Sequence, residues 1–390
     1  MTNARHYGID WLRIGAFAIL ILYHVAMVFS PWAWVVKWPE HAGWLTAPLA
    51  LLTPWRLPLL FVVGGFATRR LIARGGSMTE FARGRTMRLL LPLAFALVAL
   101  LPPEMWVRAR QLGYAGSLAR YWLVDGWQPF PAGRPGFPAW EHLWFLVYLW
   151  AYTMLAALVV GRIGMASIQA HGERWLRGQR LLWWPIAALV TARVALMFVF
   201  PETHLLLADW LGHAEYLPMF VFGLVLGGSP ALWMEIDRVR SAVGVAATAG
   251  IVVMIVELRY PGTTIPPHAV AVVDRAAQVA MAWAVVLIAL RLADRHWNRD
   301  GRWRARLAEA VFPAYLVHHP AIVVVSAWLI PTGIGAGAAF AIVLATTAAA
   351  CVAAATLARR SAWLGPLLGV GALPIGRPAR HAATVGQRRD

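Results

Sequence analysis

An arginine and a histidine stand eleven residues apart in the first long apolar run of the chain, Ile9 to Phe29. At about 100° of rotation per residue, Arg13 and His24 leave the same face of a helix, about 16 Å apart along its axis. Neutral imidazole can take a proton from a hydroxyl and return it to a leaving group. The spacing therefore predicts a polar path along this helix, with a proton-handling histidine at its far end.

Both residues also have a purely structural interpretation. His24 can bond a backbone carbonyl between two helices without any chemical role. Asp10 lies three residues before Arg13, so the two can form a local ion pair that makes an arginine tolerable in an apolar run. The alternative is that Arg13 contacts a negatively charged cytosolic ligand, and the two interpretations of Arg13 are compatible.

A second pair of histidines lies near the end of the chain. His318 and His319 fall within an apolar run and are followed by Pro320, which weakens helical bonding locally. Neighbouring side chains on a helix differ by about 100°, so at most one of the two should face the same cavity as His24. We expect the other to pack at an interface between helices.

Arginines also lie within apolar runs. Arg56 and Arg193 have no partner that is evident in the sequence, which favours a polar cavity around them. Asp274 and Arg275 are adjacent and can neutralise each other.

Arg85 and Arg88 are three residues apart just before the third apolar run. Guanidinium groups bind phosphate bidentately, so such a pair at a membrane boundary is suited to a phosphorylated ligand. The same residues also fit a simple topology signal, because positive residues accumulate in cytoplasmic loops.

The composition is that of a helical membrane protein with several spans. Hydrophobic residues make up 60% of the 390 residues and charged residues only 14%, whereas soluble domains carry about 25%. The 22 tryptophans suit rings that anchor at membrane interfaces. With a single Cys351 and no HExxH motif, the sequence contains neither a disulfide framework nor a local zinc motif, and we expect no metal.

The apolar runs predict an all-α fold with about ten transmembrane helices. The predicted spans are approximately Ile9–Phe29, Leu45–Phe66, Leu89–Val107, Ala139–Val160, Leu181–Phe200, Ala214–Leu232, Ala242–Leu258, Ala269–Leu290, Leu307–Ile330 and Ala336–Leu357.

The basic residues alternate along this arrangement. If the N-terminus is cytoplasmic, most of the 35 Lys and Arg residues fall in segments on the cytoplasmic side, which predicts that both termini face the cytoplasm. This bias accounts for most of the net charge of +17, so no nucleic-acid partner is expected. Residues 1–362 should form one transmembrane domain in contact with lipid, and residues 363–390 a basic, flexible cytoplasmic tail.

Taken together, these residues resemble the acyltransferase-3 family of integral membrane acyltransferases. Two motifs, HLWFL and RLLLPL, are similar to the branch of the family that succinylates periplasmic glucans. Two features depart from the family pattern: the second span ends in VGGF where Ser-Gly-Phe is common, and His319 is an additional histidine. The matching motifs, in chain order, are Arg13 with His24, RLPLLFVVGGF at 56–66, Arg85 with Arg88 and Pro92, HLWFL at 142–146, and Tyr315, Leu316, His318 and Pro320.

The resemblance implies a transferase in the bacterial plasma membrane. It would move an acetyl, succinyl or similar acyl group from cytosolic acyl-CoA to a hydroxyl of an extracytoplasmic glycan or another acceptor. His24 is expected to act as general base, although a covalent acyl-histidine is equally compatible with the residues. The expected catalytic residues are His24, Arg13 and His318. The residues expected to bind the donor are Arg85, Arg88 and Arg13, and those expected at the acceptor are Arg56, Tyr315, His142 and Trp144.

The competing functional class is a transporter or exporter of a polar or anionic substrate, because intramembrane Arg and His residues also mark substrate paths. Such proteins often contain an inverted repeat, and none is evident in this sequence. A non-catalytic membrane scaffold is a third class, and the number of arginines without an evident partner argues against it.

Overall fold

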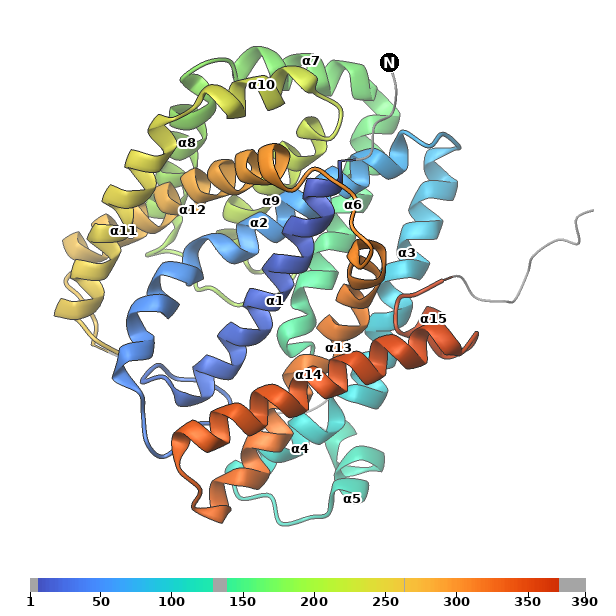
Figure 1. Cartoon of the computed structure of the whole chain (residues 1–390), viewed down its shortest axis with the longest axis vertical. Helices are drawn as coiled ribbons and strands as arrows, with labels where there is room; N and C mark the ends of the chain where they lie inside the picture. The colour runs from blue at the N-terminus through green and yellow to red at the C-terminus, as the bar shows by residue number, and fades with distance from the viewer. Residues whose placement is uncertain (1–5, 129–138, 263, 372–390) are drawn as a thin grey trace, which may run out of the picture.

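The computed structural model describes residues 6–128, 139–262 and 264–371, and every regular element in these ranges is helical (Figure 1). The predicted all-α class is therefore confirmed. The elements are α1 (Tyr7–Phe29), η1 (Gly43–Leu45), α2 (Thr46–Ile72), α3 (Met78–Phe95), η2 (Ala96–Leu100), α4 (Pro102–Gln111), α5 (Leu118–Leu123), η3 (Asp125–Trp127), η4 (Glu141–Leu143), α6 (Trp144–Ile163), α7 (Met165–Trp175), α8 (Arg180–Leu196), α9 (Trp210–Leu226), α10 (Pro230–Arg238), α11 (Ser241–Arg259), α12 (His268–His296), α13 (Arg304–Leu329), η5 (Ile330–Thr332), α14 (Ala336–Arg360) and α15 (Leu364–Leu367).

Seven of these helices are long and apolar enough to cross a membrane, namely α1, α2, α6, α11, α12, α13 and α14. Two bent pairs add up to two further spans: α3 with α4, bent by 47°, and α9 with α10, bent by 114°. Each of the ten predicted spans falls on one of these elements or on α8, which has only 17 residues. The helices thus form an integral membrane protein with seven to nine candidate spans among the described residues, and the count of ten stays a prediction.

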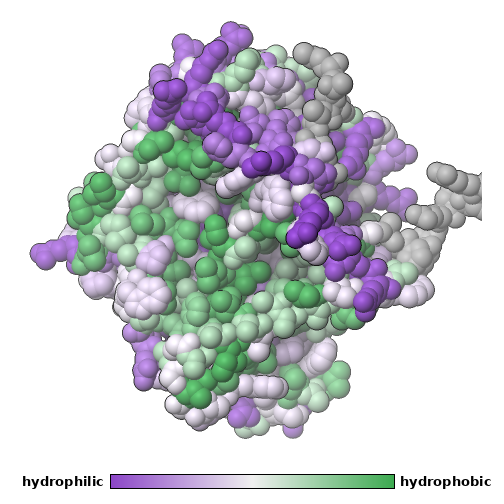
Figure 2. Space-filling model, in the orientation of Figure 1, coloured by the Kyte–Doolittle hydropathy of each residue, from purple (hydrophilic) through white to green (hydrophobic). Residues whose placement is uncertain are grey.

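The upper end of the bundle differs from its middle in the character of its surface (Figure 2). Figure 2 shows hydrophobic residues across the middle of one face and hydrophilic residues gathered at the upper end, over α7 and α10 of Figure 1. Several predicted cytoplasmic segments meet one another. Arg69 at the end of α2 donates to Gln169 of α7 at 3.3 Å, and Arg291 of α12 lies 3.5 Å from Asp237 of α10.

The predicted tail begins inside the described part of the chain. Its first residues form the short helix α15, and Leu368 and Val370 are buried against the bundle. Residues 372–390 of that tail lie outside the described residues.

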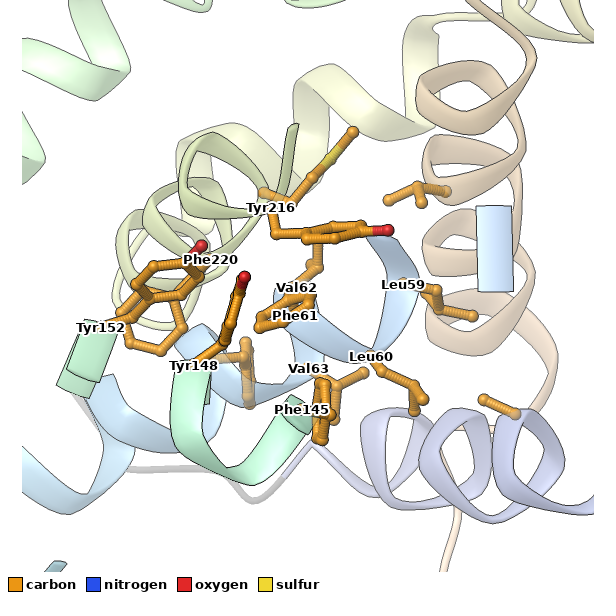
Figure 3. Close-up of a cluster of buried hydrophobic side chains, with 14 of the residues drawn as sticks. Leu59, Leu60, Phe61, Val62, Val63, Phe145, Tyr148, Tyr152, Tyr216 and Phe220 are labelled. Atoms are coloured by element: carbon orange, nitrogen blue, oxygen red, sulfur yellow. The ribbon is translucent and has the colours of Figure 1, made fainter. Parts of the chain in front are cut away.

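The core of the bundle is built where α2 packs along α9. Figure 3 shows aromatic side chains of α6 and α9 gathered around Phe61 and its neighbours on α2. Phe61 is fully buried, and its ring lies 4.9 Å from that of Tyr216 and 4.7 Å from that of Phe145. These contacts hold α2, α6 and α9 together around the residues discussed below.

Two glycines allow α2 and α9 to approach this closely. A Cβ atom on Gly223 of α9 would lie 2.0 Å from the carbonyl oxygen of Val62, and one on Gly65 of α2 would lie 1.9 Å from the carbonyl oxygen of Phe220. Small residues at helix interfaces are the usual means of close packing in membranes, where no hydrophobic effect drives helices together.

We predict that Gly223→Ala destabilises the protein by about 1–3 kcal/mol, the usual cost of overpacking, because the new methyl group meets backbone rather than a flexible side chain. Thermal unfolding in detergent measures the change. Gly244→Ala in α11 is the matched control, since a Cβ there meets nothing within 4 Å. Equal unfolding temperatures for the two variants would contradict the close approach of α2 and α9.

Candidate functional site

A cavity of about 860 Å³ opens among α1, α2, α6, α8, α9, α12 and α13, and charged side chains from distant parts of the sequence line it. Its walls include three arginines and three glutamates that lie within or beside predicted spans. The polar residues of the wall include His24, Arg56, Glu141, His142, Arg193, Glu202, His204, Glu215, Arg275, Gln278, Tyr315 and His319. We refer to this space as the histidine cavity.

A second cavity, of about 340 Å³, lies nearer the beginning of α1. Arg13, Arg85 and Arg88 line it, together with Gly369 to Gly371 from the end of the described chain. We refer to it as the arginine cavity. Leu60, Phe145 and Tyr315 line both cavities, so these three side chains form the partition between them.

A chain of hydrogen bonds fixes the protonation of His24. Its Nδ1 lies 3.0 Å from Nε2 of His318, and Nδ1 of His318 lies 2.8 Å from the carbonyl oxygen of Tyr315. A carbonyl only accepts, so His318 carries its proton on Nδ1 and, as a neutral ring, accepts through Nε2. His24 then donates through Nδ1 and keeps the lone pair of its own Nε2. This is the tautomer that a general base requires.

Tyr315 also holds His142 in a fixed orientation. Its hydroxyl donates to the carbonyl oxygen of His142 at 2.6 Å, and its carbonyl oxygen accepts from Nε2 of His142 at 3.2 Å. The second contact leaves the lone pair of His142 on Nδ1. The two bonds connect η4 to α13 and place a third imidazole beside His24 and His318.

His319 is the member of the adjacent pair that lines the histidine cavity. Its ring centroid lies 5.2 Å from that of His24 and 4.6 Å from that of His142, on which it stacks. His318 is fully buried and supports His24 through the bond described above. Only one of the pair therefore faces the cavity, and the other lies between helices.

The buried arginines differ in their partners. Arg193 lies 3.4 Å from both Glu202 and Glu215, partners that are distant enough in sequence to be missed by inspection. The guanidinium of Arg56 lies 3.2 Å above the ring of Tyr23, and its Nε and Nη1 atoms have no hydrogen-bond partner among the described residues. Arg56 is thus a buried cation with N–H groups available beside His24.

Arg13 forms the predicted contact with Asp10 and also lines a cavity, so its proposed contact with an anionic ligand stays a prediction. Its Nη2 atom lies 3.9 Å from Asp10 and donates to the carbonyl oxygen of Ala308 at 2.9 Å. The same residue lines the arginine cavity with Arg85 and Arg88. Arg13 and His24 therefore line two separate cavities, the arginine cavity and the histidine cavity. The predicted polar path along α1 is divided by the partition.

Two strained residues lie in the wall of the histidine cavity. Glu141, with φ of 38°, and His204, with φ of 54°, are the two non-glycine residues of positive φ in the described ranges. Such conformations cost of order 1–3 kcal/mol and cluster at functional sites, where the surrounding structure imposes them. Glu141 immediately precedes His142, and the ring of His204 lies 4.4 Å from that of Trp144.

The structure brings most of the predicted site residues together and adds carboxylates. His24, Arg56, His142, Trp144 and Tyr315 all line the histidine cavity. Four acidic residues of this region were not predicted. Glu104, Glu141 and Glu215 fall inside predicted spans, and an intramembrane carboxylate is itself a signal that could have identified them. Glu202 lies in a connection and gave no such signal.

Comparison with known proteins places these features in a family. The family model described as "Acyltransferase domain", of the acyltransferase-3 type, matches residues 6–358. Among curated proteins, Glucans biosynthesis protein C of Escherichia coli O6:K15:H31 (strain 536 / UPEC) is 27% identical over 162 residues, which cover 41% of this chain. The protein of the same name from Escherichia coli (strain K12) is 26% identical over 162 residues.

The aligned segment spans 40% of the length of each of these two curated relatives. No solved structure matches the chain. The family match and these relatives confirm the resemblance found from the ordered motifs, including its glucan-related branch. Because the family model covers nearly the whole described helical bundle, this chain belongs to the acyltransferase-3 family of membrane acyltransferases.

Proposed function

We propose that this protein transfers an acyl group from cytosolic acyl-CoA to a hydroxyl of an extracytoplasmic glycan, with His24 as the general base. The observation that carries the proposal is the pair of cavities, one lined by arginines and one by histidines, with a partition of three side chains between them. Such an arrangement suits a reaction whose two substrates arrive from opposite sides of a membrane.

The arginine cavity suits the donor. Arg85 and Arg88 project from α3 toward a space that Arg13 also lines, so three guanidinium groups surround one small cavity. Guanidinium binds phosphate bidentately, and acyl-CoA carries several phosphate oxygens. The cavity is too small for the whole donor, so its phosphates would lie at the mouth and its acyl arm would point toward the partition.

The histidine cavity suits a sugar acceptor. Its volume of about 860 Å³ lies within the range of about 300–1,000 Å³ that is typical of ligand sites. Trp140, Trp144 and Tyr216 supply aromatic faces for the apolar side of a sugar ring, while Arg193 and Glu215 supply groups that bind hydroxyls. The names of the curated relatives, which concern glucan biosynthesis, agree with such an acceptor.

The proposed reaction moves one proton out and back. Nε2 of His24 takes the proton of the acceptor hydroxyl, and the oxygen attacks the carbonyl carbon of the thioester. The N–H groups of Arg56 that have no acceptor among the described residues stabilise the oxyanion. The C–S bond then breaks and His24 returns its proton to the thiolate, which leaves an ester on the acceptor and free CoA.

For this reaction the thioester must pass the partition, so at least one of Leu60, Phe145 and Tyr315 has to move when the donor binds. Tyr315 is held by hydrogen bonds at both its hydroxyl and its carbonyl. Leu60 and Phe145, both labelled in Figure 3, are held by packing alone and are the more easily displaced pair.

The proposal includes ten spans with both termini in the cytoplasm of a bacterial cell, so that the arginine cavity faces the donor. The contacts among the predicted cytoplasmic segments at one end of the bundle support it. At the opposite end, Trp32 after α1 donates to Glu257 near the end of α11 at 2.8 Å, which joins a segment predicted to lie outside to the outer end of a predicted span.

We predict that His24→Ala lowers acyl transfer by about 10²–10⁴-fold, the usual contribution of a positioned general base. Release of CoA from radiolabelled acetyl-CoA or succinyl-CoA by purified protein, with a periplasmic glucan extract as acceptor, measures the rate. Donor binding by calorimetry should be unchanged, because Arg13 lies about 16 Å away along the helix. His318→Ala should show a smaller loss, since it removes only the support of the ring.

A fully active His24→Ala protein would refute His24 as the base. A wild-type protein that moves the labelled compound across a vesicle membrane with the thioester intact would instead identify a transporter.

We predict that Arg85→Ala combined with Arg88→Ala weakens binding of CoA at least about tenfold, because two charge-assisted phosphate contacts are lost. Arg83→Ala on the same helix is the control, since Arg83 does not line the arginine cavity. Calorimetry in detergent measures both. If the double variant and the control bind CoA equally well, the arginines are topology signals only.

We predict that reporter fusions after residue 390 and within the α4–α5 connection, at Leu112 to Ser117, report opposite sides of the membrane. An alkaline phosphatase fusion should be active only in the connection, and a fluorescent protein only at the end of the chain. Activity of the same reporter at both positions would overturn the ten-span topology.

A further inference from the structure

Three ligand-type side chains converge at the histidine cavity, two of them in its wall, His142 and His319, and the third, Glu104, buried beside them. Glu104 of α4, His142 of η4 and His319 of α13 each place one nitrogen or oxygen atom within 4.8 Å of those of the other two. Glu104 is fully buried and His319 is 5% exposed. A carboxylate without contact to water is costly unless a cation or a set of donors compensates it.

The polar atoms of this cluster are not satisfied by one another. Both carboxylate oxygens of Glu104, Nδ1 of His142 and Nδ1 of His319 have no hydrogen-bond partner within residues 6–128, 139–262 and 264–371. Nδ1 of His319 lies 3.0 Å from Oε1 of Glu104, but the two are not aligned as donor and acceptor. Apart from this one close contact, these four buried atoms have no hydrogen-bond partner among the described residues, although a lost bond costs about 1–3 kcal/mol each.

The state of His142 is that of a metal ligand. Its Nε2 donates to the carbonyl oxygen of Tyr315, so the lone pair is on Nδ1, the atom that belongs to the unsatisfied cluster. Histidines that bind metals usually donate their other ring N–H to a carbonyl or carboxylate, which fixes the tautomer and the orientation of the ring.

The chain positions Glu104 by local rules. Pro102 and Pro103 cannot continue the ladder of α3, so the helix passes through the π-helical turn η2 and α4 begins at Pro102. The bend places Glu104 in the first turn of α4, which packs against α13. Arg108, one turn later, forms an ion pair with Glu141, so the nearest cation of α4 is engaged by another carboxylate.

We propose that Glu104, His142 and His319 bind one divalent transition metal ion, and that zinc fits the set best. Two imidazoles and one carboxylate, with a fourth position open to substrate, are a known ligand set for catalytic zinc. The ion would compensate the buried carboxylate of Glu104 directly and use the lone pairs of the two rings. The expectation of no metal rested on missing cysteines and local motifs, whereas these ligands come from three distant segments.

The chemical role of the ion rests on the proposed function, although its binding does not. The histidine cavity is lined by His142, His319 and His24, so an acceptor hydroxyl bound to the ion would lie beside the general base. A bound metal lowers the pKa of a coordinated hydroxyl and so eases transfer of its proton to Nε2 of His24. The ion would be a Lewis acid, with no change of oxidation state.

The test is the metal content of purified protein that carries an affinity tag without histidines. After loading with Zn²⁺ and removal of free ions, mass spectrometry should find about one zinc per wild-type chain. Glu104→Gln and His319→Asn should each reduce this at least about fivefold. His318→Asn is the matched control, because it removes the neighbouring histidine, which is outside the cluster, and should retain zinc.

Folding is checked by size-exclusion chromatography and thermal unfolding in metal-free buffer. If a variant does not fold, the wild-type protein still decides: Zn²⁺ should raise its unfolding temperature, and Mg²⁺ at the same concentration should not, because only zinc binds the folded site. Wild-type protein without zinc, or equal zinc in wild type and the Glu104→Gln variant, would overturn the site. Acyl transfer by zinc-free protein would overturn the proposed role of the metal but support the proposed transferase. Zinc binding without any acyl transfer would support the metal site but contradict the proposed transferase.

Discussion

The arrangement of the histidines depends on one acceptor, the carbonyl oxygen of Tyr315. It receives a hydrogen bond from His318 at 2.8 Å and one from His142 at 3.2 Å, and because a carbonyl cannot donate, both rings must present N–H to it. This single constraint leaves a lone pair on Nε2 of His24 and another on Nδ1 of His142. Tyr315 also lines both cavities, so the residue that sets the proton positions belongs to the boundary between the two proposed substrate sites.

The buried charged side chains differ in how far neighbouring groups compensate their charge. Arg193 is compensated by two glutamates and Arg304 by Asp10, so these ions are held in ordinary pairs. Arg56 faces the ring of Tyr23 and retains N–H groups without acceptors in the described part of the chain. Glu104 is the opposite case, an acid buried beside imidazoles. Since uncompensated ions are costly in an apolar setting, these incomplete pairs identify the places where a ligand would complete the structure.

Close packing and local strain hold the cavity walls in position. Gly65 and Gly223 bring α2 and α9 together, and Arg56 of α2 and Tyr216 of α9 both line the histidine cavity. The positive φ of Glu141 turns the chain directly before His142. The partition is less constrained, because two of its three side chains are held only by packing. Rigid walls and a displaceable partition are compatible with a site that orders its groups in advance and opens between its two halves.

The sequence by itself determined the helical class, and it predicted ten spans and a common face for Arg13 and His24, because all of these follow from the composition and periodicity of single helices. Through an ordered set of motifs it also predicted residues that line the cavities, among them His24, Arg56 and His142 in the histidine cavity and Arg85 and Arg88 in the arginine cavity. Only the tertiary structure decided which of His318 and His319 faces the cavity, which carboxylates pair with Arg193, and that Glu104 meets His142 and His319. Periodicity fixes directions around one helix axis, whereas these meetings depend on how helices rotate and pack against one another, and that is set by contacts between residues far apart in the chain.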